Sequence, residues 1–65
     1  MPSTAISHFS YHPEKQVLAI TFVSGNLYHY MGVPEKVYHD LSRSASRGKY
    51  FNNYIKNHFD FKHIV

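Results

Sequence analysis

The 65-residue chain contains no cysteine, no tryptophan and only four acidic residues. Because cysteine is absent, no disulfide can support the fold, although chains of this length bury only about 60% of their unfolded surface and often need such support. Its absence also fits a reducing compartment. No apolar run approaches the roughly 20 residues that span a bilayer, and residues 1–4 lack the basic and apolar blocks of a secretion signal. We therefore expect one small cytoplasmic domain with no membrane partner.

The charge balance leans basic, with seven Lys and Arg residues against four Asp and Glu residues and a formal net charge of +3. A small basic domain favours anionic partners such as nucleic acid, nucleotides or acidic proteins. Aromatic residues make up 17% of the chain, as six Tyr and five Phe. This content indicates a core built largely from rings.

Alternation of apolar and polar residues predicts three strands in the first half of the chain. They cover residues 6–11, 16–23 and 26–31, and a break in the alternation after Ile6 indicates a bulge in the first strand. A turn at residues 12–15 joins the first two strands. With four residues, this turn places Phe9 opposite Leu18 and Tyr11 opposite Gln16, which keeps the apolar faces together.

The loop before the third strand decides which face that strand presents, because a slip of one residue exchanges its two faces. A two-residue loop, Ser24-Gly25, would place Ile20 opposite His29. A three-residue loop at residues 23–25, with Gly25 in the left-handed conformation, places Ile20 opposite Tyr28. We favour the longer loop because it gathers the apolar side chains on one surface: Leu18, Ile20, Phe22, Tyr28 and Tyr30.

After Pro34 the apolar period becomes that of a helix, with Val37, Tyr38 and Leu41 on one side. Residues 42–46 are a predicted break, since serines favour helix caps. A second helix is predicted over residues 48–58; its core-facing side chains would be Phe51, Ile55, Phe59 and either Tyr54 or His58. The tail, residues 60–65, is apolar enough to fold back as an arm or to serve an oligomer contact. The fold class is therefore α+β, a three-stranded antiparallel meander followed by two helices packed on one face.

The predicted start of the second helix combines serines, a glycine and cations. Unpaired amides and the helix dipole at such a start favour phosphate or carboxylate groups, and an arginine there could bind an anion through two hydrogen bonds. The alternative is an ordinary capped helix start. The candidate anion-binding residues are Arg43, Ser44, Ser46, Arg47, Gly48, Lys49 and Asn52.

The third strand presents Tyr28 and Tyr30 on one face and His29 on the other. Two rings on one sheet face can stack on nucleic-acid bases. The alternative is that both tyrosines are core residues under the helices, and the favoured register supports that alternative. His29 then becomes the better contact, and the candidate stacking residues are Tyr28, His29, Tyr30 and Tyr50.

Catalytic and metal-binding patterns are not found. The six histidines do not converge at the spacing of a zinc site, and we expect neither a metal nor a cofactor. The sequence has no nucleophile elbow, phosphate loop or cysteine–histidine pair, and a domain this small has little room for a water-excluding pocket. We therefore expect no catalytic residues and no enzyme.

Three short motifs carry a resemblance to a known family. Tyr28-x-Tyr30, Gly32-Val33-Pro34 and the segment Gly48-Lys49-Tyr50-Phe51-Asn52 stand at the distances found in the KTSC domain. The chain resembles this family from residue 3 to about 59, as a single free-standing domain over residues 1–65 with 60–65 as a tail. The family is named for its place at the C-terminus of some lysyl-tRNA synthetases, and this context implies RNA binding.

We therefore expect a small non-enzymatic binding module whose partner is nucleic acid, specifically RNA. One alternative is a homo-oligomer that sequesters a phosphorylated or cyclic nucleotide at the same helix start. Another is a protein-interaction module that assembles through its tail and an exposed sheet edge.

Overall fold

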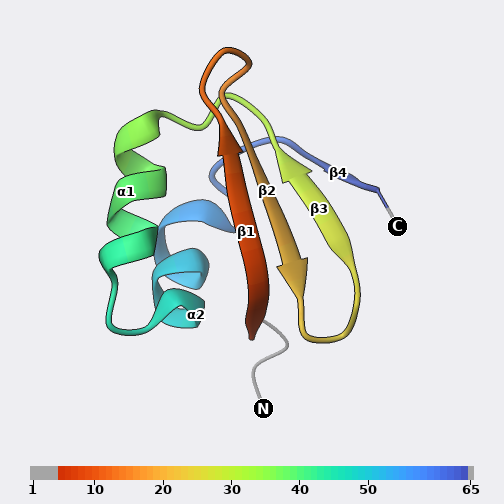
Figure 1. Cartoon of the computed structure of the whole chain (residues 1–65), viewed down its shortest axis with the longest axis vertical. Coiled ribbons are helices and arrows are strands. Elements are labelled where there is room, and N and C mark those ends of the chain that lie inside the picture. The colour runs from red at the N-terminus through yellow and green to blue at the C-terminus, as the bar shows by residue number, and fades with distance from the viewer. Residues whose placement is uncertain (1–4, 65) are drawn as a thin grey trace.

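An antiparallel sheet forms one layer of the molecule (Figure 1). The computed structural model describes residues 5–64, so the predicted start of the family resemblance at Ser3 lies outside the described residues. The four strands lie in the order β1-β2-β3-β4. Their bounds are β1 Ile6–His12, β2 Val17–Phe22, β3 Leu27–Tyr30 and β4 Phe61–His63.

Helical segments cover one face of this sheet (Figure 1). They are α1 Glu35–Arg43, α2 Arg47–Tyr50 and the π-helix η1 Phe51–Ile55, which continues directly from α2. The buried core between the layers consists of Leu18, Ile20, Phe22, Tyr30, Val33, Leu41, Phe51 and Ile55. The predicted α+β class with helices on one face is confirmed, but the predicted three-stranded meander lacks the fourth strand. None of the described helices is long and apolar enough to cross a membrane.

The hairpin between β2 and β3 has the favoured three-residue loop. Ile20 pairs with Tyr28 and Leu18 with Tyr30, and Gly25 has a φ of 96°. This left-handed conformation suits glycine because it lacks a Cβ atom. The register therefore turns both tyrosines toward the helices, as the sequence predicted.

The hairpin between β1 and β2 differs from the prediction by two residues. Phe9 pairs with Ile20, and Tyr11 pairs with Leu18 rather than Gln16. The turn extends to Gln16, whose φ of 54° carries the chain back into β2. Because a shift of two residues keeps every side chain on its face, the apolar faces still coincide. The predicted bulge is confirmed, since the register shifts after Ile6.

The second helix is shorter than predicted. It ends at Ile55 rather than residue 58, because Lys56 leaves helical geometry with a ψ of 129° and Asn57 is left-handed with a φ of 67°. Phe51 and Ile55 are buried as predicted and Phe59 is partly buried, but Tyr54 and His58 are exposed. The prediction that one of those two faces the core is wrong.

The chain reversal after Asn57 returns the tail to the free edge of β3. The backbone carbonyl oxygen of Asp60 accepts a hydrogen bond of 2.8 Å from the amide of Met31, and the amide of Ile64 donates one of 2.8 Å to the carbonyl oxygen of Leu27. Between these bonds β4 runs antiparallel to β3. An unpaired strand edge leaves backbone N–H and C=O groups without hydrogen-bond partners. The backbone of β4 provides these partners for β3. The tail thus folds back as an arm.

Candidate functional site

The serines of the predicted anion site make local hydrogen bonds at the start of α2. The Ser46 hydroxyl accepts from the amide of Lys49 at 3.4 Å, and Ser44 Oγ accepts from the amide of Ser46 at 3.1 Å. The first is the contact of an ordinary helix cap, and the second belongs to the turn before the helix. The amide of Lys49 therefore already has a partner within the protein and is not available to an anion. Gly48 lies in α2, and Asn52 is exposed on η1.

Arg47 is engaged with its own domain. Its guanidinium carbon lies 5.1 Å from the centroid of the Phe9 ring. Nη2 also donates to the carbonyl oxygen of Ser42 at 3.4 Å. A cation over an aromatic face is attracted by the ring quadrupole, so Arg47 helps to fix α2 against β1 while its side chain stays at the surface.

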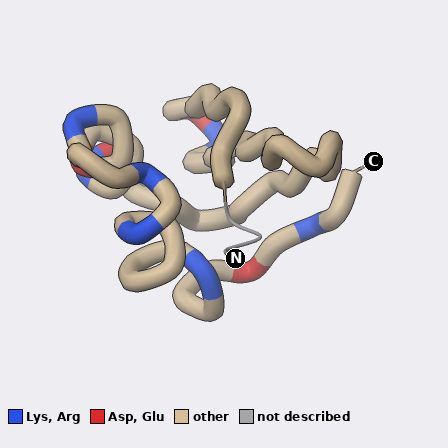
Figure 2. Tube along the Cα trace, turned by 90° about the horizontal axis from the view of Figure 1, so that it is seen from below, with Lys and Arg blue, Asp and Glu red and all other residues tan. Residues whose placement is uncertain are grey.

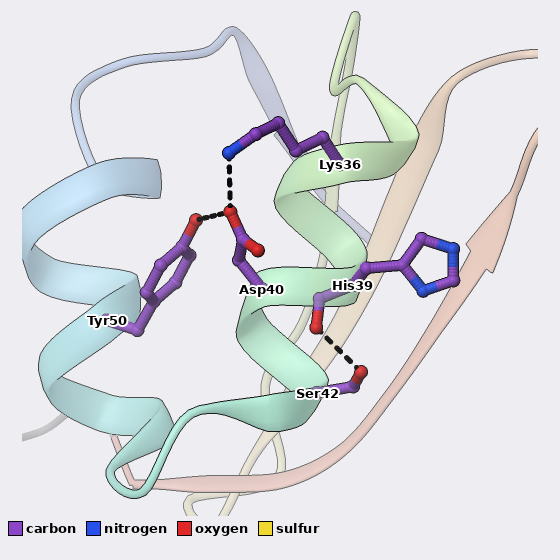
Figure 3. Close-up of polar contacts among 5 residues, drawn as sticks. All are labelled: Lys36, His39, Asp40, Ser42 and Tyr50. Carbon is purple, nitrogen blue, oxygen red and sulfur yellow. Dashed lines mark hydrogen bonds and ion pairs between the residues drawn. The ribbon is translucent and has the colours of Figure 1, made fainter.

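Tyr50 joins α2 to α1 (Figure 3). Its hydroxyl donates to Asp40 Oδ2 at 3.5 Å, and the same oxygen accepts from Lys36 Nζ at 3.0 Å. The hydrogen bond from Lys36 holds the pKa of the Asp40 carboxyl below its usual value. The Tyr50 ring also lies 4.7 Å from that of Tyr54. Tyr50 is therefore placed among the helices, apart from the tyrosines of β3.

The predicted stacking residues of β3 are divided between two faces. Tyr30 is 5% exposed and Tyr28 half-buried, both on the helix side. His29 lies on the opposite face, where it pairs with Ala19 and Lys62. That face has a shallow depression of about 440 Å³, and no described helix covers it. Alternation along a strand makes this division unavoidable.

A cleft forms at the edge of the helix-covered face, where β3, η1 and β4 meet. We call it the aromatic cleft. It has a volume of about 410 Å³, and its walls are the rings of Phe22, Tyr28, Tyr30, Phe51 and Phe61. The centroid of the Phe61 ring lies 5.5 Å from that of Tyr28 and 5.6 Å from that of Tyr30. The polar residues that line it are Ser24, Asn26, Lys56 and Asn57.

Only part of this cleft was predicted from the sequence. Tyr28 and Tyr30 were candidates, but Phe61 and Asn57 were not. These residues reach the tyrosines only because the chain reverses after η1 and adds β4 to the sheet. The available signal was the apolar tail itself, whose rings needed a surface on which to pack.

The helical half of the chain carries an excess of positive charge. Residues 41–59 contain no Asp or Glu. Their cations, which we call the helical cations, are exposed: Arg43, Arg47, Lys49 and Lys56. Figure 2 shows blue segments gathered on the helical side of the trace. Lys56 belongs both to this set and to the rim of the aromatic cleft.

These features define a small α+β domain with an antiparallel sheet, a one-sided helical layer and a candidate ligand surface along that layer. The family description of the KTSC domain matches residues 2–59, and the chain belongs to that family. The resemblance carried by the sequence motifs is thereby confirmed.

Relatives include both long and short proteins. The chain is 41% identical over 61 residues to a lysine–tRNA ligase of Nostoc punctiforme, covering 94% of this chain and 11% of that protein. A protein of Tsukamurella paurometabola is 39% identical over 57 residues, which cover 88% of this chain and 85% of that protein. The chain thus spans about a tenth of the length of the ligases that it matches.

The fold agrees with a solved structure. The crystal structure of a KTSC domain protein from Yersinia pestis superposes with a TM-score of 0.89 at 32% identity. The match covers 100% of this chain and 92% of that chain.

Proposed function

We propose that this domain is a small non-enzymatic module that binds single-stranded RNA. The observation that carries the proposal is the set of exposed helical cations on a segment without acidic residues, beside a cleft walled by rings. Cations contribute most of the affinity for nucleic acid through the phosphates, and unpaired bases stack on aromatic side chains. Some relatives are named lysine–tRNA ligases, and a tRNA substrate in those proteins supports RNA as the partner here.

Arg43 and Lys49 are the helical cations best placed for phosphate contacts. Both side chains are exposed and neither forms an ion pair within residues 5–64, and the charge of Arg43 contributes only a small part of the lowering of the Asp40 pKa. Lys36, by contrast, is paired with Asp40. The domain would therefore bind RNA through the side of α2 and the end of α1, with the aromatic cleft at one end of this surface.

Salt dependence tests this proposal directly. Binding of a labelled single-stranded RNA oligomer should weaken as salt rises, with a log–log slope of about 0.7 for each phosphate contact. The double variant Arg43→Gln, Lys49→Gln should lose part of that slope. Lys15→Gln, in the turn between β1 and β2, is the matched control and should keep it. Absence of binding, or an unchanged slope in the double variant, would overturn the proposal.

A second candidate function is the capture of a free phosphorylated or cyclic nucleotide. It is favoured by the volume of the aromatic cleft, about 410 Å³, which lies within the usual range of small-ligand pockets. In this case mononucleotides or cyclic nucleotides would raise the melting temperature without any binding to RNA. The homo-oligomer predicted with this function stays a prediction.

A further inference from the structure

We propose that the aromatic cleft holds a single nucleobase, with the adjacent phosphate bound by Lys56 and an edge of the base bound by Asn57. This inference rests on the proposed function and specifies the ligand at one position of it. The shared chemistry is a base with a phosphate, whether it belongs to an RNA strand or to a free nucleotide.

The rings of the cleft differ in how much they can offer a ligand. Phe22, Tyr30 and Phe51 are 7%, 5% and 2% exposed and form the floor. Phe61 is 56% exposed and Tyr28 is half-buried, so these two present ring surface to solvent. An exposed phenylalanine loses apolar surface to water when a planar ligand covers it, which favours binding.

The separation of the two exposed rings limits how a base can lie. Their centroids are 5.5 Å apart and their planes are inclined by 56°. A base between two rings needs about 3.5 Å on each side, so it cannot be inserted between Phe61 and Tyr28. It can pack against the face of Phe61 that lines the cleft and touch Tyr28 at its edge. His63 already covers the Tyr28 ring on one side, at a centroid distance of 4.6 Å.

Polar groups at the rim match the remaining parts of a nucleotide. Asn57 makes no side-chain hydrogen bond within the described residues. Its side-chain carboxamide offers an NH₂ donor group and an acceptor oxygen, as the edge of a base requires. Lys56 is exposed, forms no ion pair within residues 5–64, and can bind a phosphate. Asn26 is already used, since it donates to Ser24 Oγ and contacts His63 Nε2.

The backbone keeps these two rim residues in place. The amide of Lys56 donates to the carbonyl oxygen of Phe51 at 2.8 Å, which closes η1. Asn57 has a φ of 67°, a conformation that asparagine tolerates better than most residues. Lys56 and Asn57 therefore stand next to each other in the lining of the cleft.

The test compares two RNA oligomers that differ only by the loss of one base at a central position. Wild-type protein should bind the intact oligomer about fivefold to a hundredfold more tightly, as expected for one stacked base. Phe61→Leu should remove most of this preference. Asn57→Gly removes the amide at a backbone position that suits glycine and should reduce the preference without unfolding. Lys49→Gln, outside the cleft, is the control that weakens both oligomers equally.

The outcomes separate this inference from the proposed function. Equal affinity for the two oligomers, with salt dependence retained, would overturn the cleft assignment and leave RNA binding standing. Absence of binding to either would overturn both, unless a mononucleotide raises the melting temperature of wild type and not of Phe61→Leu. That last result would support the cleft with a free nucleotide as the ligand. Circular dichroism confirms that each variant is folded.

Discussion

The imidazole of His63 lies flat against the ring of Tyr28, with centroids 4.6 Å apart and planes 14° from parallel. The two residues pair across β3 and β4, so the tail is part of the sheet and one wall of the aromatic cleft depends on it. This contact links the stability of the domain to its candidate ligand surface.

Removal of residues 61–65 should therefore destabilise the domain and weaken ligand binding together. The truncation deletes the backbone bonds of β4 and the packing of Phe61 on Tyr28 and Tyr30. We expect a loss of about 2 kcal/mol in the free energy of unfolding, measured by urea denaturation. If truncation instead dissolved an oligomer and left anion binding intact, the protein-interaction alternative would be favoured.

Arg47→Ala should lower the stability of the domain, whereas Lys49→Ala should lower only its affinity for RNA. Arg47 lies over Phe9 and donates to Ser42, so its loss should cost about 1 kcal/mol of stability. Lys49 makes no such side-chain contact within the described residues and should affect only affinity for RNA. Urea denaturation and RNA titration on both variants check this. If neither variant changes the affinity for any anionic ligand, the anion-site assignment is wrong.

Stability should decline in strongly basic solution because of Tyr30. Burial, with a smaller effect of Tyr28, raises the pKa of the Tyr30 phenol from 10.0 to about 12. Between these values the folded state keeps a proton that the unfolded state has lost. The free energy of unfolding therefore falls as pH rises through this window, by up to about 1.4 kcal/mol per pH unit. Below the window both states are protonated, and the stabilisation associated with Tyr30 is fully present.

Tyr30→Phe isolates this effect. The variant keeps the ring but cannot ionise, so its unfolding free energy should fall less steeply between pH of about 10 and 12. Tyr11 and Tyr50, whose pKa values are also raised, are present in both proteins and cancel in the difference. Identical slopes for the two proteins would show that Tyr30 does not titrate as its burial implies.

Gly25→Ala should destabilise the β2–β3 hairpin. The φ of Gly25 is 96°, and nothing lies within 4 Å of a Cβ placed there, so the cost comes from backbone strain alone. We expect about 1 kcal/mol or somewhat more, measured by thermal or urea denaturation. Asn53→Ala, on the exposed side of η1, should change stability little. A neutral Gly25→Ala would mean that the loop adopts another conformation.

The pairing of β2 with β3 was predictable from the sequence, whereas the pairing of β1 with β2 was predictable only in part. Alternation and a glycine in the loop were enough to place Ile20 opposite Tyr28, because burial of one face admits only registers that keep the apolar set together. Registers two residues apart bury the same faces, so alternation does not distinguish them, and Tyr11 pairs with Leu18 rather than with the predicted Gln16. The end of the second helix was wrong because helical periodicity carries no information about where a chain must turn back.

By itself the sequence determined the α+β class, the helix-facing side of β3 and the family. All of these follow from local periodicity, turn residues and short motifs. Only the tertiary structure decided that the tail becomes β4 and that Phe61, Lys56 and Asn57 meet the tyrosines of β3. The physical reason is that the free edge of β3 needs backbone partners, and the segment that supplies them is distant in sequence.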